Sequence, residues 1–406
     1  MLLTNGITAK AVPDDWWSAS WPVLNLFSAS ISIHPDLVNL IFIVVYIFLI
    51  LKFTHVKWPI YFIFSLHLTC VYIVNGILLP VNYMTDQVNY LEEAQYARRL
   101  LLYYLKIHPD YPIYWEGMNG YPTLYVPGRI FSLMPIPYIH SFYSIGMINI
   151  FIYSVIYLIL KKMDILNGKA EWFFLLYPSL FIYNSVALRE TLIMFFLLIS
   201  VGLFIKSQPF ISILFIIPLA YIKFQILIIY FTSIIIYKII YRAYINKIDI
   251  ILLLISSSFV YYYSDWLTID SINILIKQLT YNQSNNIDLT YMNILLNMVA
   301  NIPFFLMAPL PWQAQNLFQI MQSIENIIVI ILIFSIIVKI YHKKLINMHF
   351  YFINIFFGIS ILFHSAFIHN YGTISRYRFQ FILMYLIYMY YIENKRNHSE
   401  PFKKWI

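Results

Sequence analysis

Long apolar runs recur along most of this chain and constrain its fold more than any other feature. A helix needs about 20 apolar residues to cross a hydrocarbon core of roughly 30 Å. In lipid each span must satisfy its backbone polar groups internally, so runs this apolar predict helices. We therefore expect an all-α fold: a polytopic transmembrane helical bundle of about 11 spans, with the whole chain, 1–406, as a single integral membrane domain. The expected spans are 37–53, 58–80, 141–161, 171–187, 191–206, 209–222, 224–241, 248–264, 324–341, 349–368 and 379–392.

The composition argues against a soluble protein. Apolar residues make up 61% of the chain and charged residues only 11%, whereas ordinary soluble domains carry roughly 25% charged residues. The formal net charge of +8 lies largely at the ends of apolar runs, so it indicates orientation in a bilayer, and no nucleic-acid partner is expected. The single cysteine, Cys70, excludes an intrachain disulfide. No basic segment followed by an apolar core opens the chain, so the first span is expected to direct insertion.

Lys and Arg residues cluster in alternate joins between the apolar runs, which predicts the orientation of the bundle. By the positive-inside rule those joins and the basic C-terminal tail are cytoplasmic, and the N-terminus starts outside. The alternation holds only if 290–310 is re-entrant or interfacial. Two outer loops follow, 81–140 and 265–323, and we expect them to carry short interfacial helices. The basic joins contain Lys52 and Lys57; Lys161, Lys162 and Lys169; Lys238, Arg242 and Lys247; and Lys339, Lys343 and Lys344.

The first outer loop carries the candidate catalytic acids. Asp86 follows an expected span directly, and Asp86, Tyr90 and Ala94 share one face of a helix by their spacing. A carboxylate at a membrane surface suits a general base or a metal ligand, although a surface helix with an Asp86 N-cap fits equally. Glu92 is the second candidate base. For Glu92 and Glu93 the alternative is pairing with the arginines that follow on the same helix.

The same loop continues with an aromatic segment, 120–129, whose two prolines and two glycines predict that it is not a regular helix. Tyr121 and Tyr125 could stack on a sugar ring or an isoprenoid, or form an interfacial aromatic belt. Arg129 is placed to meet an anion.

Two cations interrupt apolar sequence on the same outer side. Arg189 lies with Glu190 between two spans, and a charge at such a depth usually faces a cavity or a partner. Arginine suits a bidentate grip on phosphate, and a structural ion pair is the alternative. Lys223 is the second candidate phosphate ligand, or it extends toward the interface.

The expected loop 369–378 is the densest polar cluster between two spans. Arg376 and Arg378 violate the positive-inside rule there, and a bound pyrophosphate would explain why, because two guanidinium groups match two phosphates. His369 is a candidate substrate-binding residue or base, with a structural role as its alternative. No nucleotide-binding glycine motif or zinc motif is present, which argues against an ATP-driven pump.

These motifs, in this order, resemble those of the bacterial membrane glycosyltransferases of surface-polysaccharide assembly. That group includes the GT-C-type transferases and the Wzy-type O-antigen and capsule repeat-unit polymerases. The resemblance spreads over most of the chain. Its pieces are Asp86-x-x-x-Tyr90-x-x-x-Ala94, Tyr121-Pro122-Thr123-Leu124-Tyr125, Pro178-Ser179 leading to Leu188-Arg189-Glu190, and Asn370-Tyr371-Gly372-Thr373 leading to Arg376-Tyr377-Arg378.

The resemblance implies a GT-C-like, multi-pass protein of the bacterial inner (cytoplasmic) membrane with its active site on the periplasmic side. The implied reaction is polymerisation of undecaprenyl-pyrophosphate-linked repeat units for O-antigen, hence lipopolysaccharide, or capsule. Asp86 would be the base or a metal ligand, and Arg189, Arg376 and Arg378 would clamp the lipid phosphate. No cofactor is expected, with a divalent metal as the alternative. The implied partners are the polyprenyl-linked oligosaccharide, the lipid bilayer and other polysaccharide-assembly membrane proteins.

Two other readings remain open. The first is a GT-C-type transferase that adds a single sugar from a polyprenyl-phosphate donor. Such enzymes commonly carry an extra soluble domain, which this chain does not show, and its length and bias toward Ile, Phe and Tyr fit the polymerases better. The second is a lipid-linked oligosaccharide flippase, which internal repeats would favour; no repeat is visible in the sequence.

Overall fold

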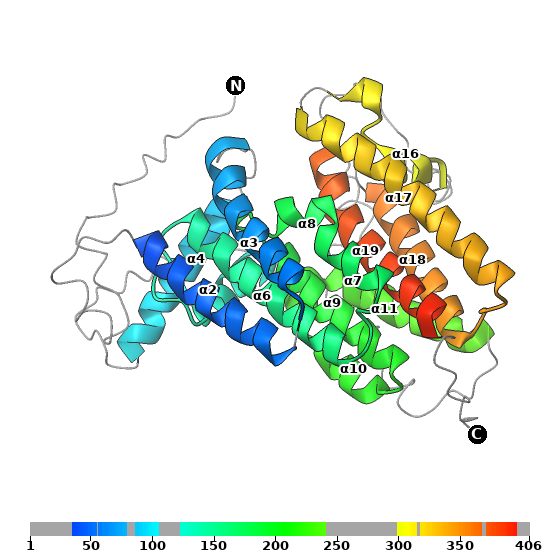
Figure 1. Cartoon of the computed structure of the whole chain (residues 1–406), viewed down its shortest axis with the longest axis horizontal. Coiled ribbons are helices and arrows are strands. Elements are labelled where there is room, and N and C mark those ends of the chain that lie inside the picture. The colour runs from blue at the N-terminus through cyan, green and yellow to red at the C-terminus, as the bar shows by residue number, and fades with distance from the viewer. Residues whose placement is uncertain are drawn as a thin grey trace.

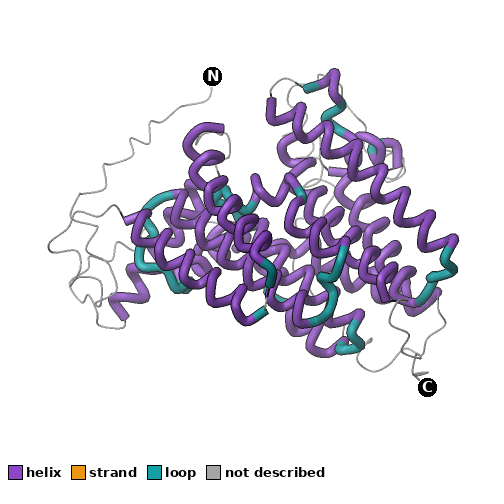
Figure 2. Tube along the Cα trace, in the orientation of Figure 1, coloured by secondary structure: helices purple, strands orange, loops and turns teal. Residues whose placement is uncertain are grey.

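The computed structural model is helical throughout the part of the chain that it describes. Within those ranges there is no β-strand, and short loops join the helices (Figure 2). The all-α expectation is therefore confirmed. The described residues are 35–54, 56–78, 86–104, 122–240, 299–314, 317–367 and 371–395.

Most of the long helices run in one common slanted direction and pack side by side (Figure 1). The first half contains α2 (Pro35–Phe53), α3 (Trp58–Ile73) with a π-helical end η2 (Val74–Leu78), α4 (Asp86–Tyr104), α5 (Pro122–Ser132), α6 (Phe142–Lys162), α7 (Lys169–Leu176), α8 (Pro178–Tyr183), α9 (Glu190–Ile205), α10 (Pro209–Ile216) and α11 (Leu219–Ile240). The second half contains α16 (Ile302–Met307), the 3₁₀ turn η4 (Pro311–Gln313), α17 (Leu317–His342), α18 (Met348–Phe367) and α19 (Tyr371–Lys395).

Five of the described helices are long and apolar enough to cross a membrane: α2, α6, α11, and most of α17 and α18. Two shorter apolar helices, α3 and α9, accompany them. On α2 and α17 many large apolar side chains face outward, Ile331 and Phe334 among them, which is the arrangement that a lipid environment requires. The chain is therefore compatible with a bilayer as its surroundings. The expected span 248–264 lies outside the described residues.

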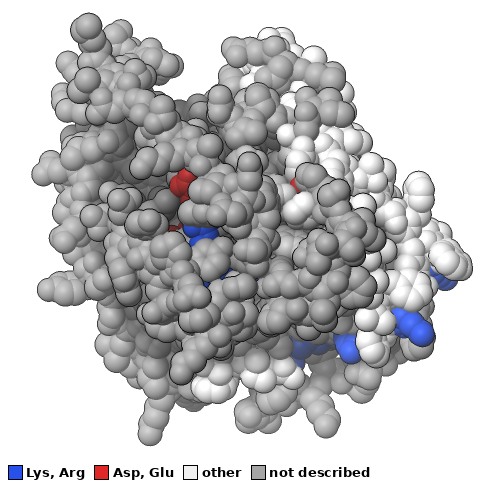
Figure 3. All heavy atoms as spheres, turned by 90° about the vertical axis from the view of Figure 1, so that its left-hand side faces the viewer, with Lys and Arg blue, Asp and Glu red and all other residues white. Residues whose placement is uncertain are grey.

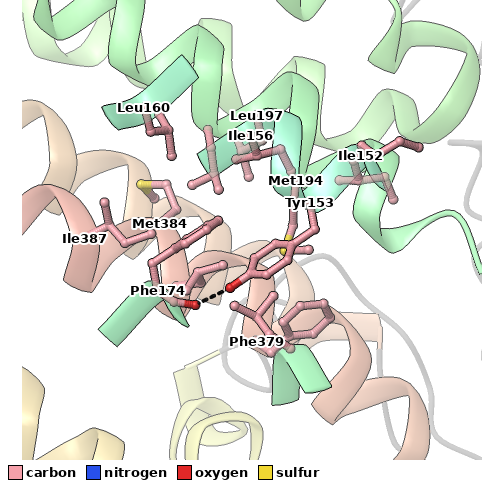
Figure 4. Close-up of a cluster of buried hydrophobic side chains, with 14 of the residues drawn as sticks. Ile152, Tyr153, Ile156, Leu160, Phe174, Met194, Leu197, Phe379, Met384 and Ile387 are labelled. Carbon is pink, nitrogen blue, oxygen red and sulfur yellow. Dashed lines mark hydrogen bonds between the residues drawn. The ribbon is translucent and has the colours of Figure 1, made fainter. Parts of the chain in front are cut away.

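The core forms where α6, α9 and α19 meet (Figure 4). Tyr153 of α6 lies fully buried there and its hydroxyl donates a hydrogen bond of 2.7 Å to the carbonyl of Phe174. From Phe379 to Ile392 every residue of α19 is buried. Helix α19 is thus a central helix of the bundle, and side chains on its first turns point into protein.

Three expected elements were wrong. The run 209–222 is not one helix, because α10 ends at Ile216 and α11 begins at Leu219, with Pro218 between them. The run 171–187 is not one helix, because Tyr177 adopts extended backbone angles and Pro178 begins the separate helix α8; a residue that precedes proline disfavours the helical region. The segment 369–378 is not a loop from Tyr371 onward, because α19 already begins there. Positive charge suggested a surface loop, whereas the arginines are carried on a packed helix.

The segment 120–129 also departs from the expectation. Helix α5 runs through it and contains Pro127. Gly128 explains how the helix packs, since a Cβ at this position would lie 2.7 Å from the Cβ of Glu93 on α4. Helix α5 therefore packs closely against α4 at Gly128. The described part of 81–140 thus holds two helices, α4 of 19 residues and α5 of 11 residues.

The second outer loop is described only from residue 299. Its described part contains the six-residue helix α16 and the turn η4, which are too short to cross a bilayer. The turn η4 precedes α17 in the chain. The rest of the expected re-entrant segment, 290–298, lies outside the described residues.

Candidate functional site

Arg376 lies between two carboxylates that come from distant parts of the chain. Its Nη1 donates to Oδ2 of Asp86 at 2.8 Å, and its Nε donates to Oε1 of Glu190. The Glu190 side chain is fully buried, that of Arg376 is 13% exposed and that of Asp86 is 40% exposed. The group therefore reaches the surface at Asp86 and continues inward to Glu190.

Helix ends bring these three side chains together. Asp86 is the first residue of α4 and Glu190 is the first of α9, where a negative side chain is favoured by the helix dipole. Arg376 lies in the second turn of α19. Asp86 and Arg376, to which the sequence assigns separate tasks, are thus in direct contact.

The turn that leads into Arg189 is held by three buried or half-buried amide side chains. Such a non-helical turn inside the bundle must find partners for its backbone groups. Gly146 of α6 permits close contact, since a Cβ there would lie 2.4 Å from the carbonyl oxygen of Ser185. The contacts are Asn149 Nδ2 to the carbonyls of Val186 and Leu188, Asn75 Nδ2 to the carbonyl of Ser185, and Ala187 N–H to Oε1 of Gln87.

Arg189 and Lys223 add positive charge beside this group. Arg189 donates from Nη1 to the carbonyl of Ile222 at 2.9 Å. The next residue, Lys223, leaves helical geometry with φ −160° and ψ 78°, so α11 is broken here. The Lys223 side chain is buried, its Nζ lies 3.2 Å from the centroid of the Tyr377 ring, and it interacts electrostatically with Arg189, Glu190 and Arg376.

Tyr90 lies one turn after Asp86 on α4 and is fully buried. It interacts electrostatically with Arg189, Glu190, Arg376 and Asp86. Burial raises the pKa of its phenol above the ordinary value, so the group is a neutral hydroxyl. We call the six residues Asp86, Tyr90, Arg189, Glu190, Lys223 and Arg376 the Arg376 cluster.

The Arg376 cluster carries three cations and two carboxylates, and several of its polar atoms are buried without a hydrogen-bond partner. These atoms are Arg376 Nη2, Lys223 Nζ, Tyr90 Oη and Glu190 Oε2. Most of these atoms are hydrogen-bond donors, so the cluster is chemically suited to an anion that accepts hydrogen bonds. On the face shown in Figure 3, acidic and basic atoms lie together near the centre.

Other predicted residues lie elsewhere. Arg378 donates from Nη1 to the carbonyls of Phe305, Leu306 and Ala308, and from Nη2 to Asn326. Arg378 thus supplies hydrogen bonds to backbone carbonyls at the C-terminal end of α16, which have no partner within the helix.

Arg129 is 59% exposed, pairs with Glu93 at 3.3 Å and lies over the ring of Tyr125 at 4.6 Å. Glu92 is exposed. Tyr121 and His369 fall outside the described residues.

Glu190 is the residue that sequence reasoning left out of the site. It was considered only as the neighbour of Arg189. A carboxylate at the start of a long apolar run is costly in a membrane and is usually functional or paired, and that signal would have identified it. Its contact with Arg376 could not be read from the sequence, since 186 positions separate the two residues.

The opposite end of α19 is basic. Glu393 accepts from Nζ of Lys343 at 3.0 Å and pairs with Nζ of Lys169 at 3.7 Å. Seventeen helical residues separate Arg376 from Glu393, which is roughly 25 Å. That length is close to the thickness of a hydrocarbon core, roughly 30 Å. The Arg376 cluster and the lysines therefore lie at opposite ends of one central helix.

The described residues contain no group of three or more His, Cys, Asp and Glu side chains that could hold a metal ion. In the Arg376 cluster a guanidinium occupies the space between the two carboxylates, which suits anion binding better than cation binding. Comparison of the chain with protein-family models, with curated proteins and with solved structures gives no match.

Proposed function

We propose that this chain is a membrane glycosyltransferase that acts on polyprenyl-(pyro)phosphate-linked sugars. The observation that carries the proposal is the Arg376 cluster: a largely buried group of basic and acidic side chains with unpartnered hydrogen-bond donors and the half-exposed carboxylate of Asp86, at one end of an apolar helical bundle. A lipid-linked phosphate would place its charged group at this end of the bundle while its polyprenyl chain stays in the bilayer.

The reaction is derived from this charge arrangement. A hydroxyl of the acceptor sugar attacks the anomeric carbon, the new carbon–oxygen bond forms, and the bond to the lipid phosphate breaks. The electron pair leaves with the phosphate, whose negative charge Arg189, Lys223 and Arg376 stabilise in a water-poor site. The hydroxyl proton goes to a carboxylate on α4. Asp86 and Glu190 hold Arg376 in position for the leaving group.

The proposed location is the bacterial inner membrane, with the Arg376 cluster on the periplasmic side of a GT-C-like bundle. The lysines at the far end of α19 support this orientation, because Lys-rich ends face the cytoplasm. On this topology the substrate is an undecaprenyl-linked oligosaccharide that already lies in the outer leaflet.

Within this class we propose polymerisation of O-antigen or capsule repeat units, with addition of a single sugar as the alternative. A flippase would need polar groups along a path through the bilayer. Unpartnered buried polar atoms are concentrated in the Arg376 cluster, but others lie along the helices at His67, Ser200 and Gln380, so the flippase stays an alternative of another class.

Deletion of the gene followed by gel analysis of the surface glycan tests the proposal. A polymerase deletion leaves one repeat unit on the lipid, whereas loss of that unit indicates the single-sugar transferase. Complementation should fail with Arg189→Ala, and also with the double variant Arg376→Gln, Glu190→Gln, which leaves no unpaired buried charge, although the protein remains in the membrane. Full chain lengths with both variants would overturn the proposed function.

A further inference from the structure

We propose that Glu93, on the same face of α4 as Asp86, is the general base that takes the proton from the acceptor hydroxyl. The inference rests on the proposed glycosyl transfer and assigns its proton acceptor. It replaces Asp86 and Glu92, the two acids that the sequence favours for this task.

Position is the first argument. Glu93 follows Asp86 by seven residues, nearly two helical turns, so both side chains point to one face about 10 Å apart along the axis. Tyr90 lies between them on that face and is buried. A phosphate held by Arg376 and an acceptor held beside Glu93 would therefore lie about 10 Å apart along α4. Glu92 is displaced from this face and is exposed.

Availability is the second argument. Asp86 is engaged by Arg376 at 2.8 Å, and removing it from that contact would disturb the phosphate clamp. Glu93 is buried, and among the residues that the structure describes it pairs with Arg129 alone, at 3.3 Å; the Arg129 side chain is 59% exposed. The Arg129 side chain is exposed enough to turn toward water while its guanidinium stays over the ring of Tyr125. The Glu93 carboxylate can then accept a proton from an incoming hydroxyl.

The chemistry of the group agrees with this position. Burial raises the pKa of the Glu93 carboxyl above its ordinary value, and the contact with Arg129 opposes part of that rise. A carboxylate with a raised pKa is a stronger base than an ordinary one near neutral pH. The backbone supports the placement, because Gly128 of α5 lets the two helices pack against the Cβ of Glu93.

The transfer step balances with Glu93 as acceptor. The acceptor oxygen bonds to the anomeric carbon, the bond from that carbon to the phosphate oxygen breaks, and the proton moves to Oε of Glu93. The leaving electron pair remains on the lipid pyrophosphate. One base and one displacement invert the anomeric configuration.

The test uses the purified full chain in lipid nanodiscs, with undecaprenyl-pyrophosphate-linked repeat units extracted from the deletion strain. Glycan length reports transfer, and displacement of a labelled undecaprenyl pyrophosphate reports binding. Glu93→Gln should lower the transfer rate by about 10²–10⁴-fold with binding unchanged. Gln95→Ala, on the opposite face of α4, should leave both unchanged. Loss of transfer in Glu92→Gln together with its retention in Glu93→Gln would overturn the assignment.

A second variant separates a base from a structural ion pair. Arg129→Gln removes the contact that lowers the pKa of Glu93, so the rising limb of the rate against pH should move to higher pH while the plateau remains. A purely structural pair predicts an unmoved limb, and that result would also overturn the assignment. If the wild-type chain forms no glycosidic bond under any condition, the proposed function fails. If it does and Glu93→Gln matches it, only the role of Glu93 fails.

Discussion

Arg376 and Asp86 are 290 positions apart in the chain, yet their side chains meet at 2.8 Å. The contact joins the first residue of α4 to the second turn of α19, and the second hydrogen bond of Arg376 fixes α9 to the same point. One guanidinium thus ties three helices at a single end of the bundle. Its two carboxylate partners differ in burial, which gives them different energetic roles.

We expect Arg376→Gln to destabilise the protein by about 3–5 kcal/mol, because the fully buried Glu190 would keep its charge without a partner. Asp86→Asn should cost no more than about 1 kcal/mol, since a half-exposed carboxylate is solvated already. Unfolding of both variants in detergent micelles measures the difference. The double variant Arg376→Gln, Glu190→Gln should recover part of the loss, and equal losses in the two single variants would contradict this account.

Tyr90→Phe should leave the fold as stable as the wild type, or stabilise it by about 1 kcal/mol, because the buried Tyr90 hydroxyl has no hydrogen-bond partner to lose. The same change should weaken binding of undecaprenyl pyrophosphate by up to about tenfold, the value of one hydrogen bond.

Tyr153→Phe is the matched control. Its hydroxyl donates to the carbonyl of Phe174 in the core, so it should lose about 1–3 kcal/mol of stability and keep its affinity. A pattern in which both tyrosines behave alike would show that Tyr90 has no special relation to a ligand.

Gly146→Ala should destabilise the bundle by about 1–3 kcal/mol, because the new methyl group would press on the carbonyl oxygen of Ser185, a backbone atom that cannot move aside. Gly358→Ala, in α18, meets no atom within 4 Å and should stabilise the helix by about 0.5–1 kcal/mol. Midpoints of thermal unfolding compare the two. A stable Gly146→Ala variant would mean that the turn before Arg189 is not closely packed on α6.

Labelling from the two sides of the membrane tests the orientation of the bundle. In a Cys70→Ala background, Glu92→Cys should react with an impermeant maleimide in intact cells, because Glu92 is exposed near the Arg376 cluster. Lys344→Cys, exposed at the far end of α17, should react only after permeabilisation. Reaction of both cysteines in intact cells would place the lysine-rich end on the outer side and remove the topological support for the function.

The sequence predicted features that depend on local pattern. The face of α4 that carries Asp86, Tyr90 and Ala94 forms as its spacing indicated, with the latter two residues buried. Lys223 was recognised as an interruption, and α11 does break there. The long apolar runs predicted the all-α fold class, because in lipid such runs have few alternatives to a helix.

Features that depend on which surfaces meet could not be predicted. Arg378 and Arg376 are two positions apart and were treated alike, yet the helix directs one to the carbonyls at the end of α16 and the other to Asp86 and Glu190. Glu92 and Glu93 are adjacent, but only Glu93 turns inward. The sequence indicates that charged side chains inside an apolar bundle need hydrogen-bond or ion-pair partners. Which partners they contact depends on tertiary packing.

Helix α19 is fastened at both of its ends, by Asp86 and Glu190 near residue 376 and by Lys169 and Lys343 at residue 393. A carrier that rocks between inward-open and outward-open shapes would have to break one of these fastenings in every cycle. Chemistry performed at one surface asks for no such movement. Under the proposed function, α19 would be a fixed support for the lipid-linked substrate.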